Sequence, residues 1–67
     1  MDKSNATLLL RGKNIACRSN IPLRKAMKEK NISVSDHLAV RAGELITDDE
    51  MVKTGDLIEL ISVISGG

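Results

Sequence analysis

Aromatic residues are absent from this 67-residue sequence, which contains no Trp, Tyr or Phe. It therefore offers no aromatic rings on which nucleic-acid bases could stack. One Cys cannot form an internal disulfide, and one Cys with one His cannot supply an all-protein zinc site. No apolar run approaches the roughly 20 residues of a membrane-spanning helix, and residues 1–6 are polar rather than signal-like. These absences predict a cytoplasmic domain without a metal site or a membrane anchor.

A strong charge of either sign is also lacking, because 10 basic and 9 acidic residues give a formal net charge of +1. This balance argues against a polybasic membrane binder and against direct, sequence-specific nucleic-acid binding. The charge is nevertheless uneven along the chain. Residues 1–41 carry nine basic and three acidic residues, whereas residues 42–67 carry one basic and six acidic residues. The acidic part could steer the chain toward a basic partner, although small domains also segregate charge by chance.

The hydrophobic pattern predicts a single domain over residues 1–67 that contains five strands and one helix. The expected elements are strands over residues 7–10 and 15–18, a helix over residues 22–30, and strands over residues 38–41, 44–46 and 57–63, the last of them the longest. Pro22 is expected at the first helical position, because its missing N–H would have no partner there. Asn31 is expected to end the helix.

This order of elements predicts an α+β fold of the β-grasp type, in which a mixed sheet of four to five strands curls around one helix. The main strand after the helix is expected to run parallel to a strand of the hairpin. Leu23, Ala26 and Met27 recur at helical spacing and are expected to face the sheet. Ile58 and Leu60 of the last strand are expected to face the helix.

Alternation along the last strand then turns Ile61 and Val63 away from the helix. Two exposed apolar side chains so close together are unusual on a monomer of this size, and we interpret them as a docking patch for a partner. A strongly curled sheet that half-covers both residues is the alternative.

The sequence Ile64-Ser65-Gly66-Gly67 follows the last strand without a linker, and residues 64–67 are expected to form a flexible tail. Glycine lacks a Cβ, so such a tail could pass through a narrow enzyme channel. Coupling a carboxylate to AMP makes an acyl-adenylate, which sulfur or nitrogen nucleophiles attack. The pattern therefore indicates that Gly67 presents a carboxylate for adenylation and that Gly66 threads the channel. A frayed end with incidental glycines is the alternative.

Four stretches carry a resemblance to a known family: the short helix at residues 23–27, the hairpin at residues 40–44, the turn Gly55-Asp56, and the tail at residues 64–67. Over nearly its full length the sequence resembles the ThiS/MoaD-type ubiquitin-like sulfur carriers. It looks closest to the ThiS-like carriers, including those that serve tRNA thiolation. The missing sheet aromatics and Ser65 before the glycine pair depart from that pattern and leave the partner's identity open.

The resemblance implies that the chain is a cosubstrate and not an enzyme. A ubiquitin-activating-type adenylyltransferase would adenylate Gly67, and ATP and Mg²⁺ would belong to that partner, so the chain itself would bind no cofactor. A cysteine desulfurase or a rhodanese-like protein would supply a persulfide, which would give a Gly67 thiocarboxylate. A synthase or a tRNA-thiolating enzyme would accept the sulfur, for thiamine thiazole, thiolated tRNA or molybdopterin. The resemblance also implies that the activating enzyme grips Ile61 and Val63.

Two other functions remain open at this point. The chain could be a ubiquitin-like protein modifier that is conjugated through Gly67 to lysines of target proteins. It could also be a plain interaction domain. We interpret Cys17 as a half-buried structural residue, His37 as a surface turn residue, and residues 48–50 as a solvated acidic loop rather than a metal site. The basic helix residues Arg24, Lys25, Lys28 and Lys30 are interpreted as a solvated face.

Overall fold

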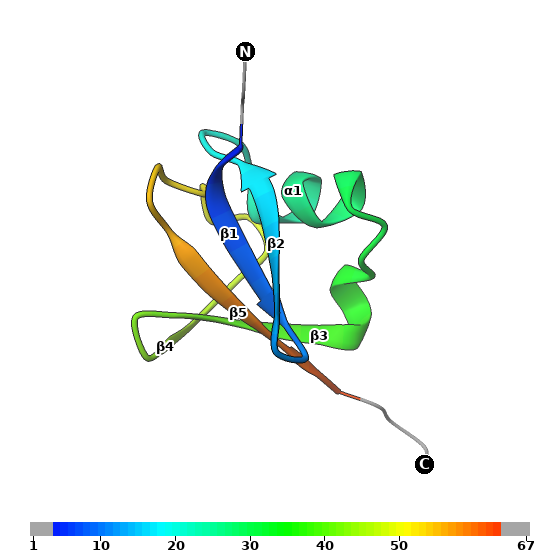
Figure 1. Ribbon diagram of the computed structural model, residues 1–67. Coiled ribbons are helices and arrows are strands. Elements are labelled where there is room, and N and C mark those ends of the chain that lie inside the picture. The colour runs from blue at the N-terminus through cyan, green and yellow to red at the C-terminus, as the bar shows by residue number, and fades with distance from the viewer. Residues whose placement is uncertain (1–3, 64–67) are drawn as a thin grey trace.

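The computed structural model describes residues 4–63, in which a five-stranded sheet packs against one α-helix (Figure 1). The elements are β1 (Ser4–Leu10), β2 (Lys13–Arg18), α1 (Leu23–Glu29), the 3-10 helix η1 (Val34–Asp36), β3 (His37–Arg41), β4 (Glu44–Ile46) and β5 (Leu57–Ser62). This architecture confirms the predicted α+β β-grasp fold. The predicted helix and all five predicted strands are present.

The sheet has the strand order β2-β1-β5-β3-β4, which places β5 at its centre. β5 runs parallel to β1 and antiparallel to β3, while β1–β2 and β3–β4 are antiparallel pairs. The parallel neighbour of the hairpin is therefore β5, and not the strand that follows the helix as the sequence pattern predicted. The segment between β4 and β5 returns the chain to the middle of the sheet. β1 has seven residues and β5 has six, so the last strand is not the longest.

Two-residue turns with positive φ join β1 to β2 and β3 to β4. The φ angles are 52° and 78° at Arg11 and Gly12, and 54° and 80° at Ala42 and Gly43. Positive φ at both central residues is typical of a type I′ turn, whose twist matches that of the flanking strands. Because the first turn needs only two residues, β2 begins at Lys13, two residues before the predicted start of that strand at residue 15.

Helix α1 begins one residue later than predicted, at Leu23. Pro22 is the preceding residue, with an extended backbone at φ −62° and ψ 147°. The first free N–H groups of the helix find partners in the loop of residues 47–56, since Leu23 donates to the carbonyl of Glu50 at 2.8 Å. The helix ends at Glu29, one residue before the predicted end, and Lys30 caps it. Asn31, the predicted stop, follows the cap with φ 61°, in the left-handed region that asparagine tolerates.

The hydrophobic core lies between α1 and one face of the sheet, which we name the inner face. Its buried members are Ala6, Leu8, Cys17, Leu23, Ala26, Met27, Ala39, Val52, Ile58 and Leu60. All five residues predicted from the helical and strand spacing are among them. Val52 was not predicted, because it lies between the predicted acidic loop and the turn at Gly55-Asp56, outside any predicted helix or strand. Its N–H donates to the carbonyl of Ile21 at 2.8 Å, which draws the loop across the end of the core.

The same loop is attached to the sheet through Arg41, the last residue of β3. Its guanidinium donates to the carboxylate of Asp56 at 3.1 Å and to that of Glu50 at 3.2 Å. Asp56 also accepts a hydrogen bond from the backbone N–H of Lys53 at 2.8 Å. Because Arg41 and Asp56 are both largely buried, this pair holds the end of the loop next to the first residue of β5.

Candidate functional site

β5, the strand that precedes the glycine pair in the sequence, lies at the centre of the sheet. β5 is paired on both sides, and the residue that follows it, Val63, donates its N–H to the carbonyl of Asp36 in η1 at 2.8 Å. The strand pairing and this additional hydrogen bond therefore hold the chain in place as far as Val63. Gly66 and Gly67, and the predicted tail over residues 64–67, lie outside the described residues.

Ile61 and Val63 are exposed, as the alternation of the last strand predicted. The two residues are 43% and 39% exposed, whereas Ile58 is fully buried and Leu60 is 3% exposed. Val63 lies just beyond β5 rather than within it. Both residues are partly covered and keep about two fifths of their surface exposed. Their use as a docking patch stays a prediction.

The structure extends these two residues into a larger apolar surface on the side of the sheet opposite α1, which we name the outer face. Ile61 is paired with Leu38 of β3, and Val40 is paired with Leu45 of β4. Because side chains alternate along a strand, Leu57 lies on the same side of β5 as Ile61. The apolar residues of the outer face within the strands are Leu9, Leu38, Val40, Leu45, Leu57 and Ile61. The exposed Val63 continues this surface just beyond β5. Of these six residues the sequence pattern identified only Ile61. Leu9, Leu38, Val40 and Leu45 lie on other strands, and Leu57 was missed at the start of the last strand.

Cys17 lies on the inner face of β2 and is completely buried, so the structure covers it more fully than the predicted half-burial. Burial raises the pKa of its thiol and outweighs the opposing effect of Lys30. A buried thiol with a raised pKa is poorly suited to act as a nucleophile. Cys17 is therefore a small apolar residue of the core.

His37 is the first residue of β3 and not a turn residue, which corrects the sequence-based interpretation. Its Nδ1 lies 2.7 Å from the carbonyl oxygen of Ser33, so the ring packs back on the segment before η1. In the acidic loop, the hydroxyl of Thr47 donates to the carboxylate of Asp49 and lowers the pKa of that group. Within residues 4–63, no three His, Cys, Asp or Glu side chains cluster closely enough to hold a metal ion.

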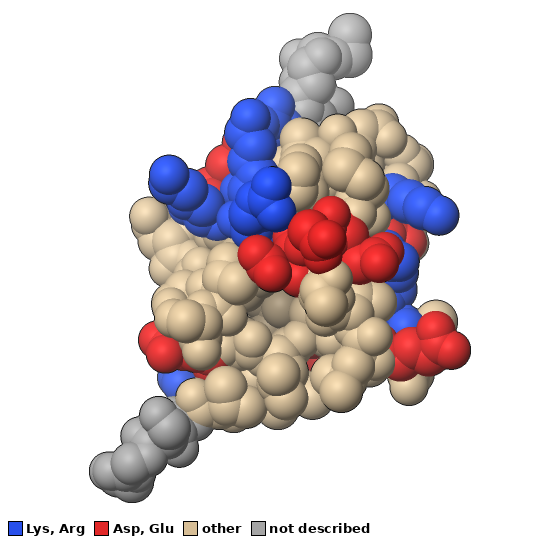
Figure 2. Space-filling view, turned by 180° about the vertical axis from the view of Figure 1, so that it is seen from behind, with Lys and Arg blue, Asp and Glu red and all other residues tan. Residues whose placement is uncertain are grey.

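Basic and acidic side chains gather beside each other on the face seen from behind in Figure 2. A groove next to α1 is lined by Arg24, Lys25 and Lys28 and also by Asp48. The basic residues of the helix are exposed, in agreement with the predicted solvated face. Among the described residues, no helix is long and apolar enough to cross a bilayer.

These observations define a class of protein: a small ubiquitin-like domain with an exposed apolar sheet face, whose central strand is followed in the sequence by a pair of glycines. No protein-family model matches the chain. The chain is 36% identical over 55 residues to the sulfur carrier protein TtuB of Thermus thermophilus, and the match covers 82% of this chain and 85% of that relative. The chain belongs to the ThiS/MoaD-type ubiquitin-like sulfur carriers.

Proposed function

We propose that this chain is a sulfur carrier that acts through a thiocarboxylate at Gly67. The observation that carries the proposal is the similarity to a sulfur carrier over most of both chains. Two features of the chain support it. Gly66 and Gly67 follow closely after β5 in the sequence, and the central position of β5 gives the tail a rigid base. The single cysteine, Cys17, is buried in the core, so its thiol is not an accessible alternative site for the transferred sulfur.

The proposed chemistry begins with attack of the Gly67 carboxylate on the α-phosphorus of ATP, which releases pyrophosphate and leaves an acyl-adenylate. The terminal sulfur of a persulfide then attacks the acyl carbon, and AMP leaves. A thiol then attacks the donor's sulfur in the resulting acyl disulfide and forms a disulfide with it, and the thiocarboxylate on Gly67 is the leaving group. Glycine is suited to both positions because an active-site channel can close around a backbone without a Cβ.

The proposal assigns the partners by their roles. A ubiquitin-activating-type adenylyltransferase brings ATP and Mg²⁺ and docks on the outer face, with Ile61 and Val63 nearest the tail. A cysteine desulfurase or a rhodanese-like protein supplies the persulfide. A synthase for thiamine thiazole or an enzyme of tRNA thiolation takes up the sulfur. The chain itself is a protein cosubstrate, so it needs neither a bound cofactor nor a catalytic residue of its own.

Intact-mass measurement of the chain isolated from its own cells tests the proposal. Part of the pool should be heavier by the replacement of one oxygen with sulfur, and fragmentation should locate the change at Gly67. Gly67→Ala should abolish the heavier species without changing the fold, whereas the matched control Ser65→Ala should retain it. A pool that contains only free carboxylate, in cells whose sulfur metabolism survives loss of Gly67, would contradict the carrier function.

The same experiment separates the carrier from the protein modifier, because an amine can attack the same acyl-adenylate. A modifier would appear as high-mass conjugates that release the chain joined through Gly67 to a lysine. Those conjugates should disappear in the Gly67-deleted strain. If they are the only product that depends on Gly67, the chain is a modifier and the thiocarboxylate proposal is wrong.

A further inference from the structure

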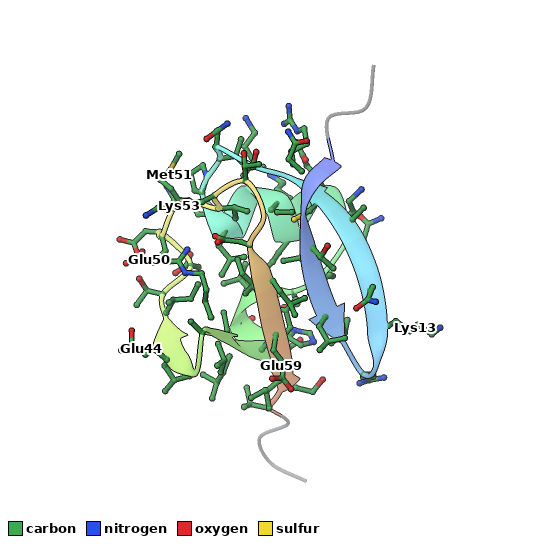
Figure 3. All side chains as sticks on the ribbon, turned by 60° about the vertical axis from the view of Figure 1, so that its left-hand side comes forward. Lys13, Glu44, Glu50, Met51, Lys53 and Glu59 are labelled. Atoms are coloured by element: carbon green, nitrogen blue, oxygen red, sulfur yellow. The ribbon has the colours of Figure 1, made fainter. Side chains whose placement is uncertain are left out.

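Glu59 occupies the centre of the outer face. It lies between Leu57 and Ile61 along β5, and its register partners on the two neighbouring strands are Leu9 and Val40. It is therefore enclosed by apolar side chains on four sides. Figure 3 shows Glu59 on β5, well separated from the labelled Glu44 and Lys13 at the two sides of the sheet. When such an apolar surface is covered, an unpaired charge at its centre is removed from water, which is strongly unfavourable.

Glu59 is also the one charged residue among the outer-face positions of β1, β5 and β3 within the described strands. No hydrogen bond or ion pair to its carboxylate occurs among residues 4–63. The cations that do form ion pairs in this part of the chain lie elsewhere: Arg18 pairs with Glu29, and Arg41 pairs with Glu50 and Asp56. Nothing in the described fold therefore uses the charge of Glu59.

Docking a partner on the outer face would remove Glu59 from water, because residues at the centre of an interface lose their hydration and those at the rim keep it. An ionised carboxylate that is buried without a partner is strongly unfavourable, whereas one that meets a cation forms a short, charge-assisted hydrogen bond. The acidic character of the C-terminal part of the chain adds a longer-range attraction toward a basic surface.

We propose that Glu59 is a specificity determinant of the outer face, and that the partner docked there presents an apolar surface with one Arg or Lys side chain placed against it. This inference rests on the proposed function, since it describes the surface of the adenylyltransferase that holds the carrier. It predicts that otherwise similar apolar surfaces without a central cation are rejected, because they would leave the Glu59 carboxylate buried and unpaired.

The experiment measures binding of the purified chain to the ubiquitin-activating-type adenylyltransferase of the same organism, by calorimetry at two salt concentrations. Glu59→Gln should weaken binding by about thirty-fold or more, and Glu59→Lys should weaken it further. The binding of both variants should also depend less on salt than that of the wild type. Glu44→Gln is the matched control, because it makes the same change at an exposed residue that lies outside the outer face, and it should bind as the wild type does.

Thermal unfolding provides the control for folding, and the Glu59 variants should melt as the wild type does because Glu59 has no partner in the described fold. Equal or tighter binding of Glu59→Gln would overturn the inference. ATP–pyrophosphate exchange that depends on Gly67 keeps the two proposals apart. If the wild type supports exchange while Glu59→Gln binds normally, only the role of Glu59 is wrong. If the wild type neither binds nor supports exchange, the proposed function fails and the inference fails with it.

Discussion

The two faces of the sheet are built from the same strands and have the same apolar character, but they differ in what covers them. On β5, Ile58 and Leu60 are buried under α1, while Leu57 and Ile61 lie on the other side and remain exposed. β1 repeats the pattern, because Leu8 is buried and Leu9 is turned to the outer face. The inner face is explained by folding. The outer face contributes less burial to this fold, and its exposed apolar residues are what the proposed docking of a partner would use.

The largest contrast between the faces should come from truncating matched isoleucines. Ile58→Ala should lower the free energy of unfolding by about 3 kcal/mol, because it leaves a cavity in a fully buried site. Ile61→Ala should change it by no more than about 0.5 kcal/mol, because that side chain is already exposed. Chemical denaturation of the two variants measures both values. Similar losses for the two variants would mean that the outer face is part of the core.

A smaller loss is expected where the loop of residues 47–56 closes the inner face. Asp56→Asn should lower the free energy of unfolding by about 1 to 2 kcal/mol, because it weakens a largely buried ion pair with Arg41 and the bond from the N–H of Lys53. Glu50 forms a more exposed ion pair with the same Arg41, so Glu50→Gln should lower the free energy of unfolding by about 0.5 kcal/mol or less. Equal effects would show that the burial of the Arg41–Asp56 pair has no energetic consequence.

The smallest effect should appear at the solvent-exposed rim of the inner face, where Arg18 of β2 pairs with Glu29 of α1. The hydrogen bond from Arg18 lowers the pKa of Glu29 below its usual range. Because the folded-state pKa is the lower one, the pair stabilises the fold above the unfolded pKa of glutamate. That contribution is lost as the pH falls through the folded value. Denaturation midpoints measured against pH should show a small advantage of the wild type over Glu29→Gln near neutral pH, which vanishes in acid.

The sequence predicted the local elements well because each is encoded by short-range signals. The i, i+3, i+4 spacing of Leu23, Ala26 and Met27 located the helix face, and alternation along residues 57–63 separated the buried from the exposed side chains. The boundaries differed by one or a few residues. Pro22 precedes the helix, and the first N–H groups of the helix donate to carbonyls of the loop of residues 47–56. A contact with such a distant segment cannot be predicted from the local sequence.

The candidate site was only partly predictable. Gly66, Gly67, Ile61 and Val63 were identified from the last strand and the tail, and the structure confirms the exposure of the two apolar residues. Leu38, Leu45 and Leu57 were missed. The first two lie on other strands, and they join Ile61 on one surface only through strand pairing.

The sequence by itself determined the class of fold, the identity of the helix-facing residues and the glycine pair after the last strand, because periodicity and composition are properties of the chain. Only the tertiary structure decided that β5 lies between β1 and β3, and that its apolar outer side is continued by theirs with Glu59 at the centre. The physical reason is that strand order depends on which distant segments bury surface together. That choice is made by the folded chain as a whole and is not encoded in any one segment.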